Sequence, residues 1–183
     1  MKSMKKAGIV GLMLAAVGLV VSCAGNTAWV QYREGLQKGY THLQYREYQP
    51  AIQQLLSASQ GDPTKAIPLA LAGQAAYQMG NYSQASQYLA QAESLVKGPD
   101  EAYIIIKGYQ ALIAFRENRQ QDGMAALGEY LRVYYFNNPD STYYDLERMY
   151  KSGNIVFPTA EGWINNQLSR YEGQLQQWGW TSR

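Results

Sequence analysis

The residue types that carry most protein chemistry are scarce in this chain of 183 residues. His42 is the only histidine and Cys23 the only cysteine, so a histidine-based metal cluster and a disulfide scaffold are both excluded. A serine–histidine triad would have to use His42, which falls near an expected hairpin turn. Ser94 and Lys97 match a serine–lysine spacing, but they stand at the end of an expected helix without companion motifs. The sequence therefore predicts no enzyme, no metal site, no cofactor and no small-molecule substrate.

Cys23 stands where a covalent modification is expected. Residues 1–6 are basic, and residues 7–21 form an apolar run of 15, shorter than the roughly 20 residues that span a bilayer as a helix. The segment Val20-Val21-Ser22-Cys23 follows and resembles the lipobox of bacterial lipoproteins. The resemblance implies that residues 1–22 are a signal peptide, that the Cys23 thiol receives a diacylglycerol thioether, and that the new amino group is acylated.

Cleavage and sorting of the leader leave alternatives open. Ser22-Cys23-Ala24 is a small-x-small pattern, so an ordinary signal peptidase could cut after Ala24, or the leader could remain as a short anchor. Many Gram-negative lipoproteins that stay in the inner membrane carry Asp after the cysteine, so Ala24 implies, by the same resemblance, the periplasmic face of the outer membrane. Residues 23–31 then form a lipid-anchored linker and the start of the first helix. This position would bring Trp29 and Tyr32 close to lipid head groups.

The charge of the chain excludes one class of partner. The formal net charge of +2 depends on Lys2, Lys5 and Lys6 in the leader; without them, 13 of the 16 basic residues remain against 14 acidic ones. Because a nucleic-acid-binding domain needs a basic face, we expect no nucleic acid. Sixteen tyrosines against three phenylalanines suit surfaces that are half apolar and half wet, as interfaces often are.

Small and apolar residues recur at a spacing of 34 in the first part of residues 32–137. The coinciding pairs are Gly39 with Gly73, Tyr48 with Tyr82, Ala51 with Ala85, Leu55 with Leu89, and Ala58 with Ala92. Within each copy the spacing of i, i+4, i+7 predicts two packed amphipathic helices. The pattern resembles the tetratricopeptide repeat (TPR), whose helical hairpins stack into an array. The resemblance implies an all-α fold with about three TPR-like repeats.

The copies match this pattern unequally. The best copy spans residues 69–92, whereas the copy at about 32–65 has Gly35 where the pattern favours a large apolar residue. The copy at about 104–137 needs a shift of 38, with its four extra residues in Lys97-Gly98-Pro99-Asp100 and an atypical turn at Asn118. The competing interpretation is that any array of helical hairpins rich in small residues drifts into such a pattern.

Residues 138–183 are expected to be C-terminal capping helices, because the end of a stacked repeat exposes an apolar face. Asp140 can cap a short helix that Gly153 ends. A second, amphipathic helix is expected from Thr159, with an apolar stripe that covers the third repeat. The stripe runs through Ile164, Leu168, Tyr171, Leu175 and Trp178.

Proteins of the TPR family bind partners in a concave groove lined by the first helix of each repeat. Carried over residue by residue, the resemblance assigns a partner-binding groove to Leu36, Tyr40, Leu43, Gln44, Gln74, Tyr77, Gln78, Leu112, Phe115 and Arg116. Tyr40, Tyr77 and Phe115 would form a row that suits an extended or helical peptide. The competing interpretation is burial between helices, above all for Leu36 and Leu112. Truncation of Tyr77 would then lower stability instead of weakening binding.

The expected function is that of a membrane-anchored periplasmic lipoprotein with a protein or peptide partner in its groove. By resemblance it is similar in plan to repeat-bearing lipoproteins that act as scaffolds or assembly factors for secretins, pili or outer-membrane proteins. The alternative is a glycan-binding accessory factor in polysaccharide export or cell-wall maintenance, because aromatic rings stack on sugar faces. Aromatic residues clustered on an exposed face would favour a glycan, and aromatic residues along the groove would favour a peptide.

Overall fold

The computed structural model describes residues 27–136 and 139–177, and within these ranges the chain is all-helical, with eight helices and no strand. This confirms the predicted fold class. The predicted signal peptide, Cys23 and Trp178 lie outside the described residues. The first helix covers residues 27–44 and is here called the N-terminal helix. It is followed by α2 (Tyr48–Gly61), α3 (Ile67–Gln78), α4 (Tyr82–Leu95), α5 (Glu101–Arg116), α6 (Gln120–Tyr134), α7 (Ser141–Ser152) and α8 (Phe157–Gln177).

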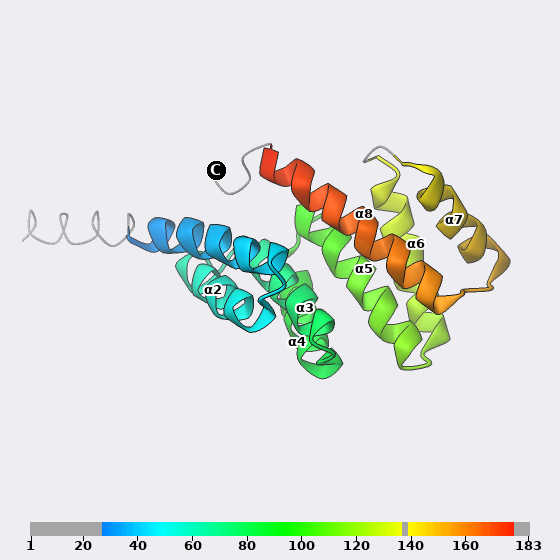
Figure 1. Cartoon of the computed structure of the whole chain (residues 1–183), viewed down its shortest axis with the longest axis horizontal. Helices are drawn as coiled ribbons and strands as arrows, with labels where there is room; N and C mark the ends of the chain where they lie inside the picture. Colours follow the sequence, from blue (N-terminus) through cyan, green and yellow to red (C-terminus); the bar gives the residue numbers. More distant parts are fainter. Residues whose placement is uncertain (1–26, 137–138, 178–183) are drawn as a thin grey trace, which may run out of the picture.

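The helices pack as neighbours along the chain, which is the arrangement expected of stacked hairpins (Figure 1). The N-terminal helix pairs with α2, α3 with α4, and α5 with α6, and α3 joins the second hairpin to both the first and the third. The four extra residues before the third hairpin lie between α4 and α5. There the Asp100 carboxylate accepts hydrogen bonds from the amides of Ala102 and Tyr103 and so caps the start of α5.

A small residue at one shared position lies where the two helices of each hairpin meet. A Cβ placed on Gly39 would lie 2.6 Å from Cγ of Leu55, and a Cβ on Gly73 would lie 2.7 Å from Cγ of Leu89. These two contacts are 34 residues apart in sequence, as the repeat pattern predicts. In the third hairpin the corresponding positions, 111 and 127, are an alanine and a leucine that are both fully buried.

The three hairpin turns share one backbone geometry. Arg46, Gly80 and Asn118 all have a positive φ, of 60°, 76° and 59°. In each turn this residue's amide donates to the carbonyl three residues earlier, and the next amide donates to the carbonyl five residues earlier. The atypical residue at the third turn therefore keeps the same turn, because asparagine tolerates the left-handed conformation better than most residues do.

Gly35, which departs from the repeat pattern, lies against the backbone of α2. A Cβ at this position would be 2.8 Å from both the amide nitrogen of Ala58 and the carbonyl oxygen of Gln54. The N-terminal helix thus approaches α2 more closely than a large side chain would allow. Gly61 of α2 lies against the backbone of Tyr32, which is only 6% exposed. The expectation that Tyr32 touches lipid head groups is therefore wrong, whereas Trp29 is 45% exposed.

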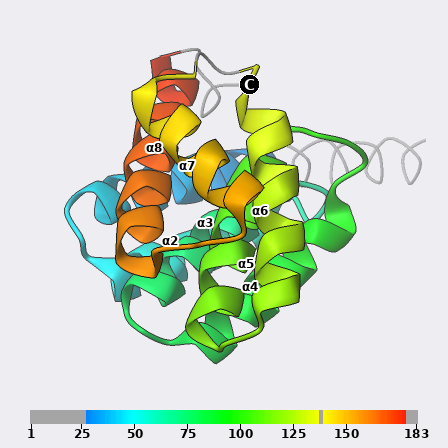
Figure 2. The same cartoon turned by 90° about the vertical axis from the view of Figure 1, so that its right-hand side faces the viewer.

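The two C-terminal helices return to the repeats (Figure 2). α7 lies between α6 and α8, begins at an Asp140 cap and ends at Gly153, as predicted. α8 begins at Phe157, two residues earlier than expected, because Pro158 fits in a first helical turn where no amide hydrogen bond is required. No helix within the described ranges is both long and apolar enough to span a membrane.

The positive φ of Arg46 predicts a stabilising substitution. Arg46→Gly should raise the free energy of unfolding by roughly 0.5–1 kcal/mol, because glycine adopts this conformation without a Cβ clash. The converse change, Gly80→Ala, should lower it by about 1 kcal/mol, since nothing but its conformation opposes a Cβ there. Urea unfolding of both variants measures the two effects, and equal midpoints for all three proteins would contradict the shared turn geometry.

Candidate functional site

The face of the array formed by the N-terminal helix, α3 and α5 is here called the groove face, and α8 lies along part of it (Figure 1). Ile164 and Leu168 of α8 pack over Gly108 of α5, at 3.3 and 3.0 Å from where its Cβ would lie. Asn165, between them, accepts hydrogen bonds from Gln78 at 3.1 Å and from the Tyr109 hydroxyl at 3.0 Å. The stripe of α8 thus covers the third repeat, as predicted, and the groove face is partly occupied by the chain itself.

The ten predicted groove residues separate by burial. Six of them are less than 9% exposed: Leu36, Tyr40, Leu43, Tyr77, Leu112 and Phe115. Leu36 and Leu112 have no exposed surface, so a partner cannot contact them and the alternative of burial between helices holds. Phe115 packs on α6, where a Cβ at Gly123 would lie 2.5 Å from its ring, so Tyr40, Tyr77 and Phe115 form no exposed aromatic row. Gln44, Gln78 and Arg116 are exposed and Gln74 is half-buried.

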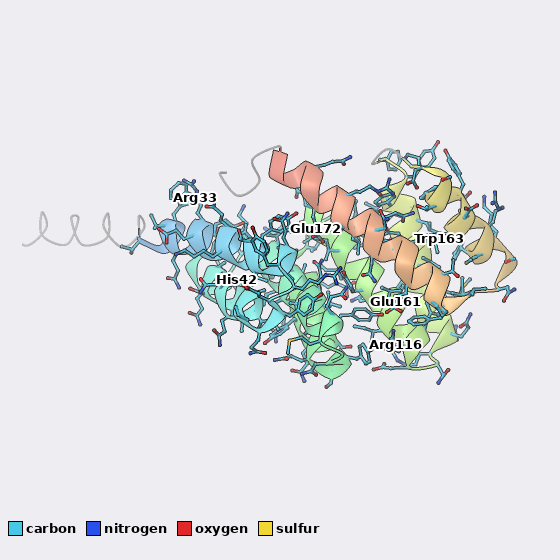
Figure 3. All side chains as sticks on the ribbon, in the orientation of Figure 1. Arg33, His42, Arg116, Glu161, Trp163 and Glu172 are labelled. Atoms are coloured by element: carbon cyan, nitrogen blue, oxygen red, sulfur yellow. The ribbon has the colours of Figure 1, made fainter. Side chains whose placement is uncertain are left out.

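Tyr77 and Arg116 hold the first turn of α8 in place. The Tyr77 hydroxyl donates to Glu161, and Arg116 forms an ion pair with the same carboxylate at 2.7 Å (Figure 3). The Arg116 guanidinium also lies 4.8 Å from the ring centre of Phe157 and 5.1 Å from that of Tyr82. Burial, reinforced by the hydrogen bond to Glu161, raises the pKa of Tyr77. Two predicted groove residues therefore bind α8 rather than stand free for a partner.

A polar pocket of about 520 Å³ opens on the groove face toward the other end of α8. All three first helices contribute to its wall together with α8, the turn after the N-terminal helix and the start of α2. Five predicted groove residues line it, namely Tyr40, Leu43, Gln44, Gln74 and Gln78. The residues that sequence reasoning missed are Arg46, Tyr48, Tyr109, Asn165, Ser169, Glu172 and Gly173.

Glu172 is the most unusual residue of this pocket. Its side chain is only 4% exposed, and its Oε1 atom has no hydrogen-bond partner. Burial raises its pKa to about 8, against a smaller opposing effect of the Gln74 side chain. Oε1 of Gln74 is also buried without a partner. The pocket therefore contains two buried oxygen atoms without a hydrogen-bond partner, a state that folded proteins seldom tolerate.

The signal for Glu172 was present in the sequence. It follows Leu168 by four residues and Ile164 by eight, which places it on the apolar stripe of the same helix. A carboxylate on such a stripe becomes buried when the stripe packs against neighbouring helices. Because a buried carboxylate is costly, such a residue is a candidate for function.

Two further groups of polar side chains in the described residues are paired internally. Within residues 27–136 and 139–177, no group of three His, Cys, Asp or Glu side chains could hold a metal ion. His42 forms a contact of 2.5 Å with Glu47 across the first hairpin turn. A second pocket, of about 400 Å³ between α4, α5 and α6, contains Lys107, which is paired with Glu93. No other cluster in these ranges matches the unpaired acceptors at Glu172.

No known family model matches this chain, and a comparison with curated protein sequences finds no significant relative. A function can therefore be inferred only from the geometry of the pocket.

Truncation of Tyr77 should lower stability because its ring is buried 5.2 Å from Tyr109 and 5.3 Å from Tyr82. Tyr77→Ala should reduce the free energy of unfolding by about 3 kcal/mol or more. Tyr77→Phe keeps the ring and loses only the hydroxyl that donates to Glu161, so its loss should be about 1–2 kcal/mol. Urea unfolding distinguishes the two, and an unchanged midpoint for Tyr77→Ala would refute the packing role.

Glu172 should make the protein less stable as the pH rises. In the unfolded chain this carboxyl ionises near its ordinary pKa of 4.5, whereas in the folded chain it keeps its proton up to about pH 8. Its contribution is complete below pH 4.5 and is lost between pH 4.5 and 8, by up to about 1.4 kcal/mol per pH unit.

Glu172→Gln should remove this slope and stabilise the protein at pH 8. Glu147 is only half-buried and is paired with Lys151, so Glu147→Gln offers a matched control. Urea unfolding at pH 5, 6.5 and 8 measures the slopes. Parallel curves for Glu172→Gln and the unsubstituted protein would show that Glu172 is not held neutral.

Proposed function

We propose that this chain is a lipid-anchored periplasmic scaffold protein that binds another protein at the pocket on its groove face. The observation that carries the proposal is the convergence of all three first helices on one open polar pocket. Helical repeats present extended surfaces of this kind, and their rigidity reduces the entropy that a partner loses on binding. The role is that of a scaffold or assembly factor in the cell envelope.

The lining of the pocket suits a protein segment. Gln44 is exposed and offers an amide donor and acceptor for a peptide backbone, and the exposed Gln78, whose amide nitrogen donates to Asn165, offers its carbonyl oxygen. Tyr40 and Tyr109 supply buried apolar walls beside them. A polar rim around apolar walls is the usual composition of a protein interface.

The anchor is proposed from the lipobox resemblance at Cys23, and one feature of the N-terminal helix supports it. Trp29 is 45% exposed, and the guanidinium of Arg33 lies 4.6 Å from the centre of its ring. An exposed tryptophan beside a cation is typical of a surface near lipid head groups. The residue after the lipobox cysteine, Ala24, favours the outer membrane.

A glycan-binding role is the second candidate, and one observation favours it. Tyr135, Phe136 and Tyr144 are 51%, 81% and 46% exposed around the α6–α7 connection. The rings of Tyr135 and Phe136 are 5.6 Å apart and nearly perpendicular, at 82°. Because these two rings meet edge to face, they offer a sugar a smaller flat surface than coplanar rings would.

In-cell photo-crosslinking tests the proposed function. A benzophenone amino acid replacing Gln44 at the pocket rim should capture a specific envelope protein. The same replacement at Gln53, which is exposed on α2, should not capture it. Cys23→Ala should abolish lipidation, release the protein from the membrane fraction and reduce the adduct.

Three results would contradict parts of the proposal. An unlipidated mature protein that starts at Gly25 would remove the anchor, and recovery with the inner membrane would remove the proposed location. Absence of any Gln44 adduct, together with oligosaccharide binding that Phe136→Ala abolishes, would replace protein binding by the glycan role.

A further inference from the structure

We propose that the pocket at Glu172 receives a basic side chain, lysine or arginine, of the partner protein, with Glu172 and Gln74 as its acceptors. This inference rests on the proposed function, because it assumes that the partner is a protein. It specifies the chemistry of one contact, which neither the repeat pattern nor the groove assignment provides.

The unpaired acceptors are the first argument. Oε1 of Glu172 and Oε1 of Gln74 are both buried without a hydrogen-bond partner, and both residues line the same pocket. A buried acceptor left without a donor costs stability, so such a pair needs an explanation. An ammonium or a guanidinium carries several donors and no acceptor, and it would satisfy both oxygens together.

The size and walls of the pocket are the second argument. A volume of about 520 Å³ is far larger than the space of a single water molecule, so it admits a long side chain. Tyr40, Tyr48 and Tyr109 line it from three different helices. Aromatic walls favour a cation, and they also pack against the aliphatic stem that lysine and arginine carry.

The pairing of the other carboxylates is the third argument. Glu161, Glu93 and Asp140 each have a cation from another helix, namely Arg116, Lys107 and Arg170. Glu172 forms no ion pair with a described residue, although it is far more buried than these three. An acidic group kept in this position without a cation from residues 27–136 or 139–177 fits a cation supplied by another molecule.

Among the residues that the structure describes, Arg46 is the only cation that lines the pocket, and it does not fill this role. It lies in the exposed turn after the N-terminal helix and has no ion pair with Glu172. Its charge sits at the rim, where it weakens the attraction for an incoming cation without neutralising the carboxylate.

Binding of a cation should be coupled to loss of a proton. In the free protein burial raises the pKa of Glu172 to about 8, so the carboxyl is largely protonated at neutral pH. A bound cation favours the carboxylate, and the proton is released to water. The titratable and charged groups that face Glu172 are Tyr40, Tyr48, Tyr109 and Arg46. Burial and the charge of Glu172 raise the pKa values of Tyr40 and Tyr109 above 10, so these two stay neutral in this range.

The test uses capped tripeptides and the full-length protein in detergent. Acetyl-Gly-Lys-Gly-amide and its arginine analogue are titrated while resonances of the pocket residues are followed by NMR. The norleucine analogue is the uncharged control. We expect saturable shifts with lysine and arginine only, and a Kd that falls about tenfold per pH unit from pH 6 to 8 and levels off above.

Variants separate the carboxylate from the rest of the protein. Glu172→Gln should weaken binding of the charged peptides at least tenfold and abolish its pH dependence, whereas Glu147→Gln should change neither. Equal shifts with norleucine, or a pH-independent Kd for the unsubstituted protein, would overturn the inference without reference to any variant.

The crosslinking experiment distinguishes this inference from the proposed function. A Gln44 adduct that persists at full yield in Glu172→Gln would leave protein binding in place and refute the cation site. Binding of the lysine peptide in a protein that forms no adduct in cells would support the cation site and refute the protein partner.

Discussion

Each hairpin of this domain depends on the distance at which its two helices can meet. In the first two hairpins a glycine faces a leucine from the second helix, at Gly39–Leu55 and Gly73–Leu89, and no side chain could be added without displacing the leucine. Dispersion contacts weaken quickly with separation, so this close approach gives each pair its packing energy. The same approach fixes the angle at which the next hairpin stacks. The first helices of the hairpins form the groove face, so its shape depends on the distance between the two helices of each hairpin.

The groove face is partly covered by α8 and is therefore only partly exposed to solvent. α8 packs over α5 and occupies polar groups that would otherwise be available to a partner. The polar groups of Tyr77, Gln78 and Arg116 bind Glu161 and Asn165 of α8. The covering is incomplete toward the N-terminal helix, and the pocket at Glu172 lies in the remaining space (Figure 3). A site of this kind requires both the repeats and the helix that follows them. Neither half would bury the carboxylate alone.

The sequence predicted well those features that depend on local spacing. Small residues separated by 34 and capping signals such as Asp140 act within one hairpin or one helix, so their pattern can be read along the chain. The exposed fractions of Leu36, Leu112 and Phe115 could not be predicted in this way, because they depend on how closely neighbouring helices pack around these side chains. Gly35 illustrates the difference: it weakened the match to the repeat, yet it permits a close backbone contact between the two helices of the first hairpin. Glu172 depends on both kinds of information. Its position on the apolar stripe of α8 could be read from the sequence, but its pocket forms only where α8 packs on the first helices of the hairpins.

The position of α8 also bears on how the chain matures. Gly108 receives Ile164 and Leu168 from a segment more than fifty residues downstream, so the third repeat cannot complete its core until the end of the chain is available. During synthesis the hairpins emerge first, while the apolar face of α5 is still uncovered. A chain truncated before α8 would leave this apolar face exposed and the pocket incomplete. Exposed apolar surface of this kind is recognised by chaperones and proteases.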